Sequence, residues 1–151
     1  MLSKTELVSK ILSQLETNRL KEAAAGLAEG FNLSGPAPRP HNKSEFLELM
    51  EGLVSAIPDW RFNMTDAKET RDGLQIKLHI SGTNSRPINI PLLGIRSVHS
   101  TGKRVALPEE PVEVKIVENK IVVFNVSPVA GGGIQGLFKQ LGVELPVPTK
   151  A

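Results

Sequence analysis

Residues 74–81 constrain the fold of this chain most strongly, because apolar and polar side chains alternate there without a break. The apolar positions are Leu74, Ile76, Leu78 and Ile80. The polar positions between them are Gln75, Lys77, His79 and Ser81. Successive side chains of a strand point to opposite faces, so this segment is predicted to be a strand with one covered face and one solvated face. That combination is typical of antiparallel sheets.

The same pattern predicts further strands. Residues 112–116 alternate in the same way, turn at Glu118-Asn119 and return as the apolar run 121–126. Asp72-Gly73 is a hairpin signal just before the long strand. Residues 60–64 and 104–107 are additional candidate strands, whereas residues 82–103 show no regular period. We therefore expect four or five strands that are consecutive in the chain.

Helical spacing dominates the first third of the chain. Apolar residues recur every three or four positions in 3–17 and 42–57, and each of these segments begins with a capping-box pattern. A second helix is expected after residue 18, ending at Gly26 or Gly30, and a short fourth helix is expected over 134–141.

This order of elements predicts an α+β fold, in which a curved antiparallel sheet and N-terminal helices close a cone-shaped pocket. The length of 151 residues favours a single domain over 1–151, with an ordered core from about residue 3 to about residue 143. The proline-rich segment 35–40 is predicted to be a rigid loop.

Composition excludes several classes of function. The chain has no cysteine, so thiol catalysis and thiolate metal sites are excluded. The net charge is only +2 and basic residues do not cluster, which argues against nucleic acid as a partner. No apolar run approaches the roughly 18 residues of a membrane span, and the N-terminus lacks a signal-peptide pattern, so we expect a cytoplasmic protein without a membrane partner. No pair of histidines has ligand spacing, and we expect neither a metal nor a cofactor.

Five short motifs resemble, in their order and spacing, the SnoaL-like polyketide cyclase group of the nuclear-transport-factor-2-like superfamily, whose domains have a cystatin-like cone fold. The motifs are Pro58-Asp59-Trp60-Arg61-Phe62, Ile80-Ser81-Gly82-Thr83, Thr101-Gly102-Lys103-Arg104-Val105, Asn119-Lys120-Ile121-Val122 and Gln140-Leu141-Gly142. The similarity extends from about residue 5 to residue 143. It implies a cofactor-free aldol ring closure and a homodimer.

The chain departs from the pattern of this group at its acid/base positions. Asn84 stands where the group usually has a histidine, and Asn125 stands where it usually has a tryptophan. The acidic residue that normally follows this tryptophan has no counterpart, because residues 126–130 contain no carboxylate. The acid/base residue of the group therefore cannot be carried over to this chain.

His79 is the candidate catalytic residue, because imidazole titrates near neutral pH. The alternative interpretation is a partly exposed strand histidine that bonds a neighbour. Asn125 is the one polar residue in a run expected to be buried, so it either orients a ligand oxygen or bonds the main chain. Asn84 is a second candidate donor.

Three aromatic residues, Trp60, Phe62 and Phe124, are candidate ligand contacts, although such residues also commonly fill a core. Asp59 could be a catalytic carboxylate but is better interpreted as a cap of the turn after the helix 42–57. The run Gly131-Gly132-Gly133 is interpreted as a hinge, since the residues that follow it do not complete a phosphate-binding loop.

Two functions remain open. The first is a cofactor-free cyclase or isomerase that acts on a small apolar or carbonyl-containing ligand, with His79 as acid/base and Asn84 or Asn125 as donor. The second is a non-catalytic ligand-binding or dimeric assembly module on the same fold. We also expect a homodimer, because one face of such a sheet needs cover.

Overall fold

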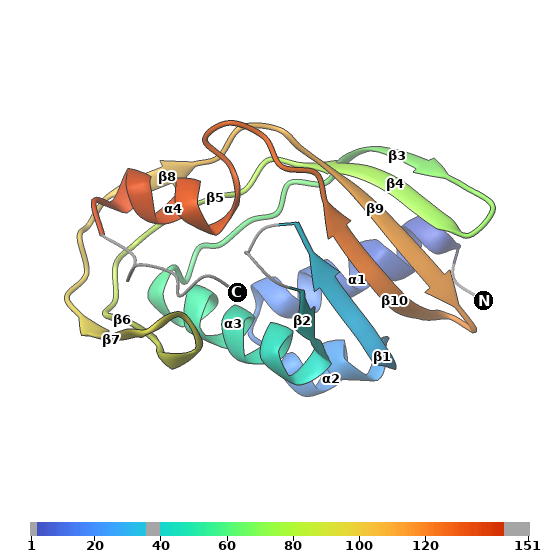
Figure 1. The fold of residues 1–151 in the computed structure, drawn as a ribbon, viewed down its shortest axis with the longest axis horizontal. Coiled ribbons are helices and arrows are strands. Elements are labelled where there is room, and N and C mark those ends of the chain that lie inside the picture. The colour runs from blue at the N-terminus through green and yellow to red at the C-terminus, as the bar shows by residue number, and fades with distance from the viewer. Residues whose placement is uncertain (1–2, 36–39, 144–151) are drawn as a thin grey trace.

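A computed structural model describes residues 3–35 and 40–143, and Figure 1 shows their course. The elements in chain order are α1 (Lys4–Glu16), α2 (Leu20–Ala25), β1 (Leu27–Ser34), β2 (His41–Asn42), α3 (Lys43–Ala56), β3 (Thr65–Glu69), β4 (Gly73–Leu78), β5 (Ser81–Thr83), β6 (Ile88–Ile90), the 3₁₀ turn η1 (Pro91–Leu93), β7 (Ile95–Val98), β8 (Arg104–Ala106), β9 (Glu110–Val117), β10 (Lys120–Val126) and α4 (Gly133–Leu141). Most of the predicted rigid loop at 35–40 lies outside the described residues.

The two long helices begin where their capping boxes predict. At α1 the amide of Glu6 donates to Ser3 Oγ at 3.1 Å, and the Ser3 amide donates to Glu6 Oε1 at 3.0 Å. At α3 the residues Asn42 and Glu45 form the same reciprocal pair, at 2.9 and 3.1 Å. Each box satisfies amides at the helix start that have no partner within the helix.

The main sheet has six strands in the order β2-β1-β10-β9-β4-β3. The long strands β4, β9 and β10 pair antiparallel to one another, with Leu78 opposite Glu110 in the β4–β9 ladder. The predicted turn between β9 and β10 is formed by Glu118 and Asn119, whose φ values of 51° and 62° suit a tight hairpin turn. The alternation and the turn signal in the sequence therefore predict this hairpin correctly, although its ladder contains a register shift between Ile121 and Val123.

The candidate strand over 60–64 is not formed, since only an isolated bridge pairs Arg61 with Ser81, and β3 begins after it at Thr65. The longest strand of the main sheet that the sequence pattern did not predict is β1. It begins at Leu27, directly after α2 ends at its cap Gly26, and it pairs with β10 in parallel, whereas every other pair of the main sheet is antiparallel. A register irregularity falls between Leu27 and Asn32, so buried and exposed positions do not alternate regularly along the strand. A strand without alternation gives no period-two signal.

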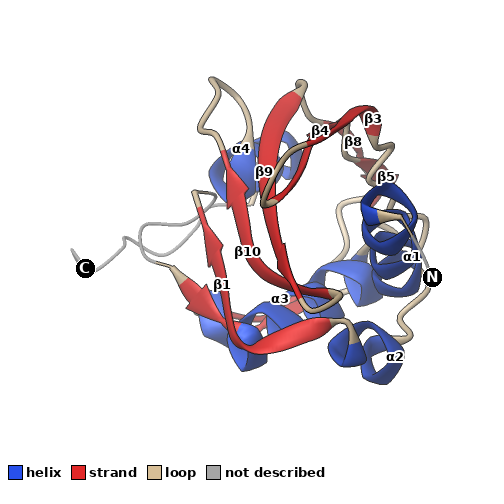
Figure 2. Ribbon diagram, turned by 90° about the vertical axis from the view of Figure 1, so that its right-hand side faces the viewer, coloured by secondary structure: helices blue, strands red, loops and turns tan. Residues whose placement is uncertain are grey.

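The sheet curves around the helices, as Figure 2 shows, so that one face is covered and the other is open. Leu74, Ile76 and Leu78 of β4 are each at most 2% exposed and lie on the covered face. The alternate residues Gln75 and Lys77 are more exposed and lie on the open face. The fold is thus α+β, with a curved sheet and helices that enclose one apolar core, as the sequence predicts.

Residues 82–103, which show no regular period, contain two short paired segments. Strand β5 pairs with β8, and β6 pairs with β7 around η1. The β6–β7 hairpin lies against α3 at Gly52, where a Cβ atom would come within 2.6 Å of Ile90 Cγ1. Among the described residues, no helix combines the length and the apolar character that a membrane crossing requires.

Candidate functional site

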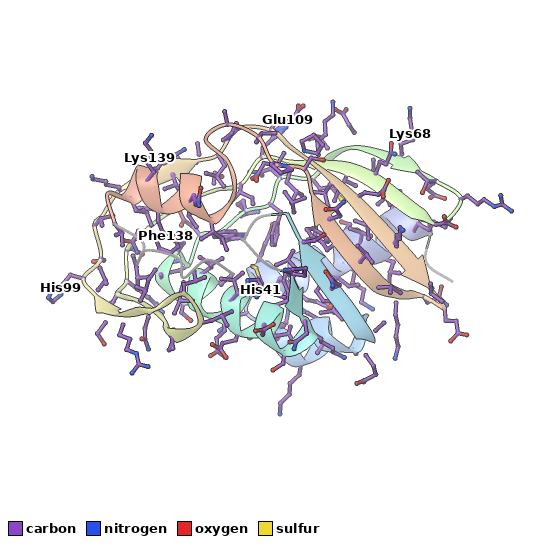
Figure 3. The ribbon with its side chains drawn as sticks, viewed as in Figure 1. His41, Lys68, His99, Glu109, Phe138 and Lys139 are labelled. Carbon is purple, nitrogen blue, oxygen red and sulfur yellow. The ribbon has the colours of Figure 1, made fainter. Side chains whose placement is uncertain are left out.

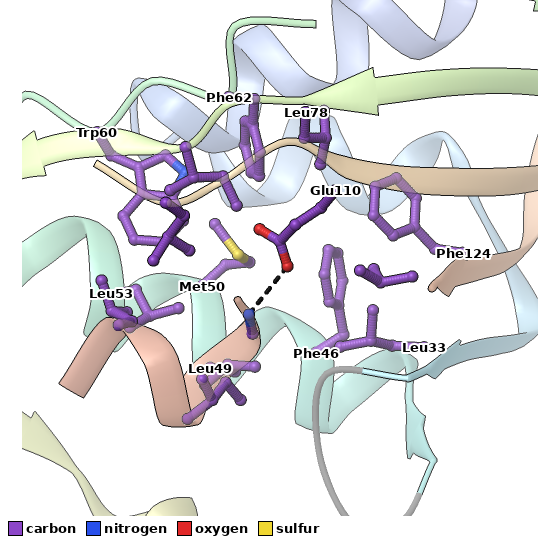
Figure 4. Close-up of a pocket in the computed structure, with 16 residues that line it drawn as sticks. Leu33, Phe46, Leu49, Met50, Leu53, Trp60, Phe62, Leu78, Glu110 and Phe124 are labelled. Atoms are coloured by element: carbon purple, nitrogen blue, oxygen red, sulfur yellow. Dashed lines mark hydrogen bonds between the residues drawn. The ribbon is translucent and has the colours of Figure 1, made fainter. Parts of the chain in front are cut away.

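A small cavity lies between α3, the sheet and the start of α4 (Figure 4). Its volume is about 70 Å³. The lining residues are Leu33, Phe46, Leu49, Met50, Leu53, Trp60, Phe62, Leu78, Ile80, Leu107, Glu110, Phe124, Val126, Gly133, Ile134 and Leu137. Among the residues that the structure describes, Glu110 is the one ionisable residue in this lining. The cavity is therefore an apolar pocket that contains a single carboxyl group.

Glu110 reaches the pocket because it is the first residue of β9. Val112 and Val114 of this strand face the core, and the period of two extends back from them to Glu110. The residue is 3% exposed. Figure 4 shows its carboxyl group in the middle of the ring of lining side chains.

The two carboxyl oxygens of Glu110 have different surroundings. Oε2 accepts a hydrogen bond of 2.9 Å from the amide of Gly133, at the start of α4. Oε1 is buried and has no hydrogen-bond partner. Burial raises the pKa of the carboxyl group, and the hydrogen bond from Gly133 offsets part of this increase. A buried carboxyl group with a raised pKa and one unpaired oxygen is a candidate to take or give a proton.

The glycine run 131–133 fits closely around Glu110. A Cβ atom on Gly132 would lie 3.1 Å from Glu110 Oε2, and the φ values of Gly131 and Gly133 are 79° and 69°, which favour glycine. The N-cap residue of α4 is Gly132, which has no side chain to accept a hydrogen bond from the helix start. The carboxyl group of Glu110 instead accepts a hydrogen bond from the amide of Gly133. These contacts place Gly132 and Gly133 beside the Glu110 carboxyl group, and the interpretation of the run as a hinge stays an untested prediction.

The predicted aromatic contacts Trp60, Phe62 and Phe124 all line the pocket. The rings of Trp60 and Phe62 meet edge to face, with centroids 5.8 Å apart. Phe124 lies 6.4 Å, centroid to centroid, from Phe46 of α3. Trp60 is 4% exposed, and its Nε1–H is buried without a hydrogen-bond partner. Two residues of the lining, Trp60 and Glu110, therefore each carry a buried polar atom without a hydrogen-bond partner.

His79 is absent from the pocket lining. It lies on the open face of the sheet, between Leu78 and Ile80, and its side chain is 37% exposed. Its Nε2 is 3.5 Å from Oε1 of Glu109, which lies at the outer surface (Figure 3), and makes no hydrogen bond. The other oxygen of Glu109 is 3.5 Å from Lys77 Nζ. The exposure thus agrees with the partly exposed strand histidine of the alternative interpretation, without the bond to a neighbour, and a catalytic role stays an untested prediction.

Asn84 is fully buried but does not line the pocket. Its Nδ2 donates to the carbonyls of Ala56 and Arg86 at 3.0 and 2.8 Å. Its Oδ1 accepts from the amide and the hydroxyl of Thr101 at 2.8 and 3.1 Å. The side-chain amide therefore connects the end of α3 to the loop before β8, and its hydrogen-bonding groups are all used within the protein.

Asn125 is exposed, so the expectation that its amide is buried is wrong. It points to the open face of the central strand β10 and accepts a hydrogen bond of 2.9 Å from Ser34 Oγ on β1.

Asp59 accepts a hydrogen bond of 2.6 Å from the amide of Thr83, and this bond lowers the pKa of its carboxyl group. This bond joins the segment after α3 to β5, so it is not the local cap of the turn that the sequence predicts.

Comparisons with known proteins were made by sequence and by structure. No protein-family sequence model matches the chain, and no curated protein matches it in sequence. Solved structures match it over nearly its whole length. A protein from Jannaschia sp. CCS1, assigned as a SnoaL-like polyketide cyclase, has a TM-score of 0.71 at 8% identity and covers 93% of this chain and 92% of its own.

Two further similar structures are named for different activities, one as a polyketide cyclase and one as a hydroxylase. A SnoaL-like polyketide cyclase from Agrobacterium tumefaciens has a TM-score of 0.66 at 18% identity, covering 94% of this chain and 100% of its own. AclR from Streptomyces galilaeus, assigned as a hydroxylase, has a TM-score of 0.69 at 18% identity, covering 97% and 89%. The chain therefore has the SnoaL-like cone fold, as the motifs predict. Identities this low show the fold alone, and one fold supports different chemistry.

Proposed function

We propose that the chain binds a small, largely apolar molecule in this pocket and that Glu110 transfers a proton to or from it. The observation that carries the proposal is the single carboxyl group, with one unpaired oxygen, in an otherwise apolar lining. The proposed reaction class is a cofactor-free isomerisation or cyclisation, and proteins of this fold named as polyketide cyclases support it.

The chemical step requires a proton next to a carbonyl. The ionised carboxyl group of Glu110 takes this proton from carbon, the C–H electron pair forms a carbon–carbon double bond, and the carbonyl electron pair moves onto oxygen. The protonated Glu110 then returns a proton to the same or another carbon. Apolar surroundings make the carboxylate a stronger base than it is in water, because burial raises its pKa.

The volume of the cavity limits the ligand in this conformation. About 70 Å³ is less than half of the roughly 150 Å³ of a protein cavity known to hold benzene. A larger substrate needs side chains to move, and Met50 in the lining is the most adaptable of them, since its side chain is unbranched and flexible. Small ring compounds are therefore the appropriate first probes.

The proposal is tested by exchange of the α-protons of cyclopentanone for deuterium in D₂O, followed by ¹H NMR. The protein is expected to accelerate this exchange, and Glu110→Gln is expected to abolish the acceleration. Glutamine has nearly the same size and can still accept from the Gly133 amide, but it cannot take the proton. Acceleration by Glu110→Gln equal to that of the wild type would exclude Glu110 as the base.

Two variants serve as matched controls for this experiment. Glu109→Gln removes the neighbouring carboxyl group, which lies near His79 on the open face of the sheet, and it should leave the exchange unchanged. His79→Ala tests the catalytic residue predicted from the sequence. Loss of exchange in His79→Ala, with exchange retained in Glu110→Gln, would return the acid/base role to His79.

The second candidate, a non-catalytic binding or assembly module, is favoured by the small cavity. It predicts binding of a probe without exchange of its protons. We further propose that the chain forms a homodimer and is cytoplasmic. Support for the dimer is the uncovered face of the sheet, and sedimentation that shows only monomer at micromolar concentration would contradict it.

A further inference from the structure

The indole N–H of Trp60 is a buried donor that nothing in the protein satisfies. Trp60 is 4% exposed, and Nε1 has no hydrogen-bond partner although its residue lines the pocket. Leaving a buried donor without a partner destabilises the folded state, so natural structures rarely retain one without a reason. A ligand oxygen in the pocket would provide this partner.

We propose that Trp60 is a specificity-determining residue of the pocket, whose Nε1–H donates to an oxygen of an uncharged ligand while Glu110 contacts the same molecule. This inference rests on the proposed function, because it assumes that the pocket takes a small molecule. It assigns the ligand class: a neutral, mostly apolar compound with a hydrogen-bond-accepting oxygen, such as a cyclic ketone.

The rest of the lining supports an uncharged ligand. No lysine, arginine or histidine of the described residues lines the pocket, so a phosphate or carboxylate group would be buried there without a counter-ion from them. The nearby carboxyl group of Glu110 would also repel an anionic ligand group whenever Glu110 is ionised. In the view of Figure 4, Trp60 lies on one side of the Glu110 carboxyl group and Phe124 lies on the other.

Another arrangement would also account for an unpaired N–H. The Trp60 and Phe62 rings are tilted by 74°, so the indole edge could direct its N–H at the face of the Phe62 ring. In that case the donor is satisfied weakly within the protein and selects no ligand oxygen. The two arrangements differ in the chemical shift of the indole proton, because the face of an aromatic ring shifts a proton upfield.

The test uses ¹⁵N-labelled full chain, in which Trp60 is the only tryptophan and gives one indole N–H cross-peak. Cyclopentanone is compared with methylenecyclopentane, a ring of the same size that lacks the oxygen. We expect the indole proton to move downfield when cyclopentanone is added but not when methylenecyclopentane is added. We also expect cyclopentanone to bind about three- to tenfold more tightly than methylenecyclopentane, which is the contribution of one net hydrogen bond. In Trp60→Phe this preference should disappear.

The possible failures are distinguishable. The role of Trp60 is overturned if both rings bind equally and the indole proton does not move downfield. It is also overturned if the indole proton lies upfield and neither ring moves it. In both cases the pocket remains a ligand site. Failure of both rings to perturb the backbone amides of Leu78 and Leu107 overturns the proposed function as well. If Trp60→Phe does not fold, the wild-type indole shift still decides between these outcomes.

Discussion

Truncation of Asn84 to alanine is predicted to destabilise the protein strongly, because the side-chain amide makes four hydrogen bonds in the core. The Thr101 amide and the Arg86 carbonyl lose these bonds in Asn84→Ala, while the Ala56 carbonyl keeps one from the Arg86 amide at 3.3 Å. At about 1 kcal/mol for each hydrogen bond lost, the expected cost is about 3–4 kcal/mol. For a chain of this length that corresponds to a decrease in Tm of roughly 10 °C.

The measurement is urea unfolding followed by circular dichroism, with Asn125→Ala as the control. Asn125 is exposed and bonds one hydroxyl, so its truncation should cost less than about 0.5 kcal/mol. A loss below about 1 kcal/mol for Asn84→Ala would refute the structural role of the amide. Unchanged stability together with weaker binding of cyclopentanone would instead support the ligand contact predicted from the sequence.

Two further predictions concern α4 and the carboxyl group that it bonds. Gly136→Ala should destabilise the protein, because the added Cβ would overlap the carbonyl oxygen of Gly131. This overlap should outweigh the preference of alanine over glycine in a helix, which is about 1 kcal/mol. The measurement is thermal unfolding, and the control is Gly30→Ala, whose added Cβ has no atom within 4 Å. The raised pKa of Glu110 means that the folded state retains the proton more strongly, so its contribution to the free energy of unfolding is greatest below the reference pKa of 4.5 and is lost as pH rises through the folded pKa. Glu110→Gln should therefore gain stability relative to the wild type as pH increases, and a difference that is constant with pH from 4 to 8 would contradict this reasoning.

The sequence predicts the parts of this fold that follow a regular period. The alternation predicts that Leu78 lies on the covered face and that the segments of β9 and β10 form a hairpin. The capping boxes predict where α1 and α3 begin. Strand β1 could not be predicted in the same way, because its irregular register removes the alternation. Its parallel pairing with β10 depends on contacts between distant parts of the chain, which local patterns do not report.

The site was predicted in part. Trp60, Phe62 and Phe124 line the pocket because large apolar residues mark the covered face, and their contact with a ligand stays a prediction. His79 is predicted to be in the pocket although its alternation places it on the polar, open face. Glu110 was missed, yet the sequence held a signal for it. The apolar positions Val114 and Val112 lead back by twos to Glu110, so a charged residue occupies a position that the pattern assigns to the interior.

The ionisation of Glu110 tests most directly whether this pocket holds a functional carboxyl group. The measurement is the ¹³C shift of the Glu110 carboxyl carbon, assigned by its absence in Glu110→Gln and followed through a pH titration with and without cyclopentanone. We predict a midpoint above the reference value of 4.5 and a displacement of that midpoint when the ketone is added. A midpoint at or below 4.5 that the ketone does not change would show that the carboxyl group is solvated and that the pocket is not the site.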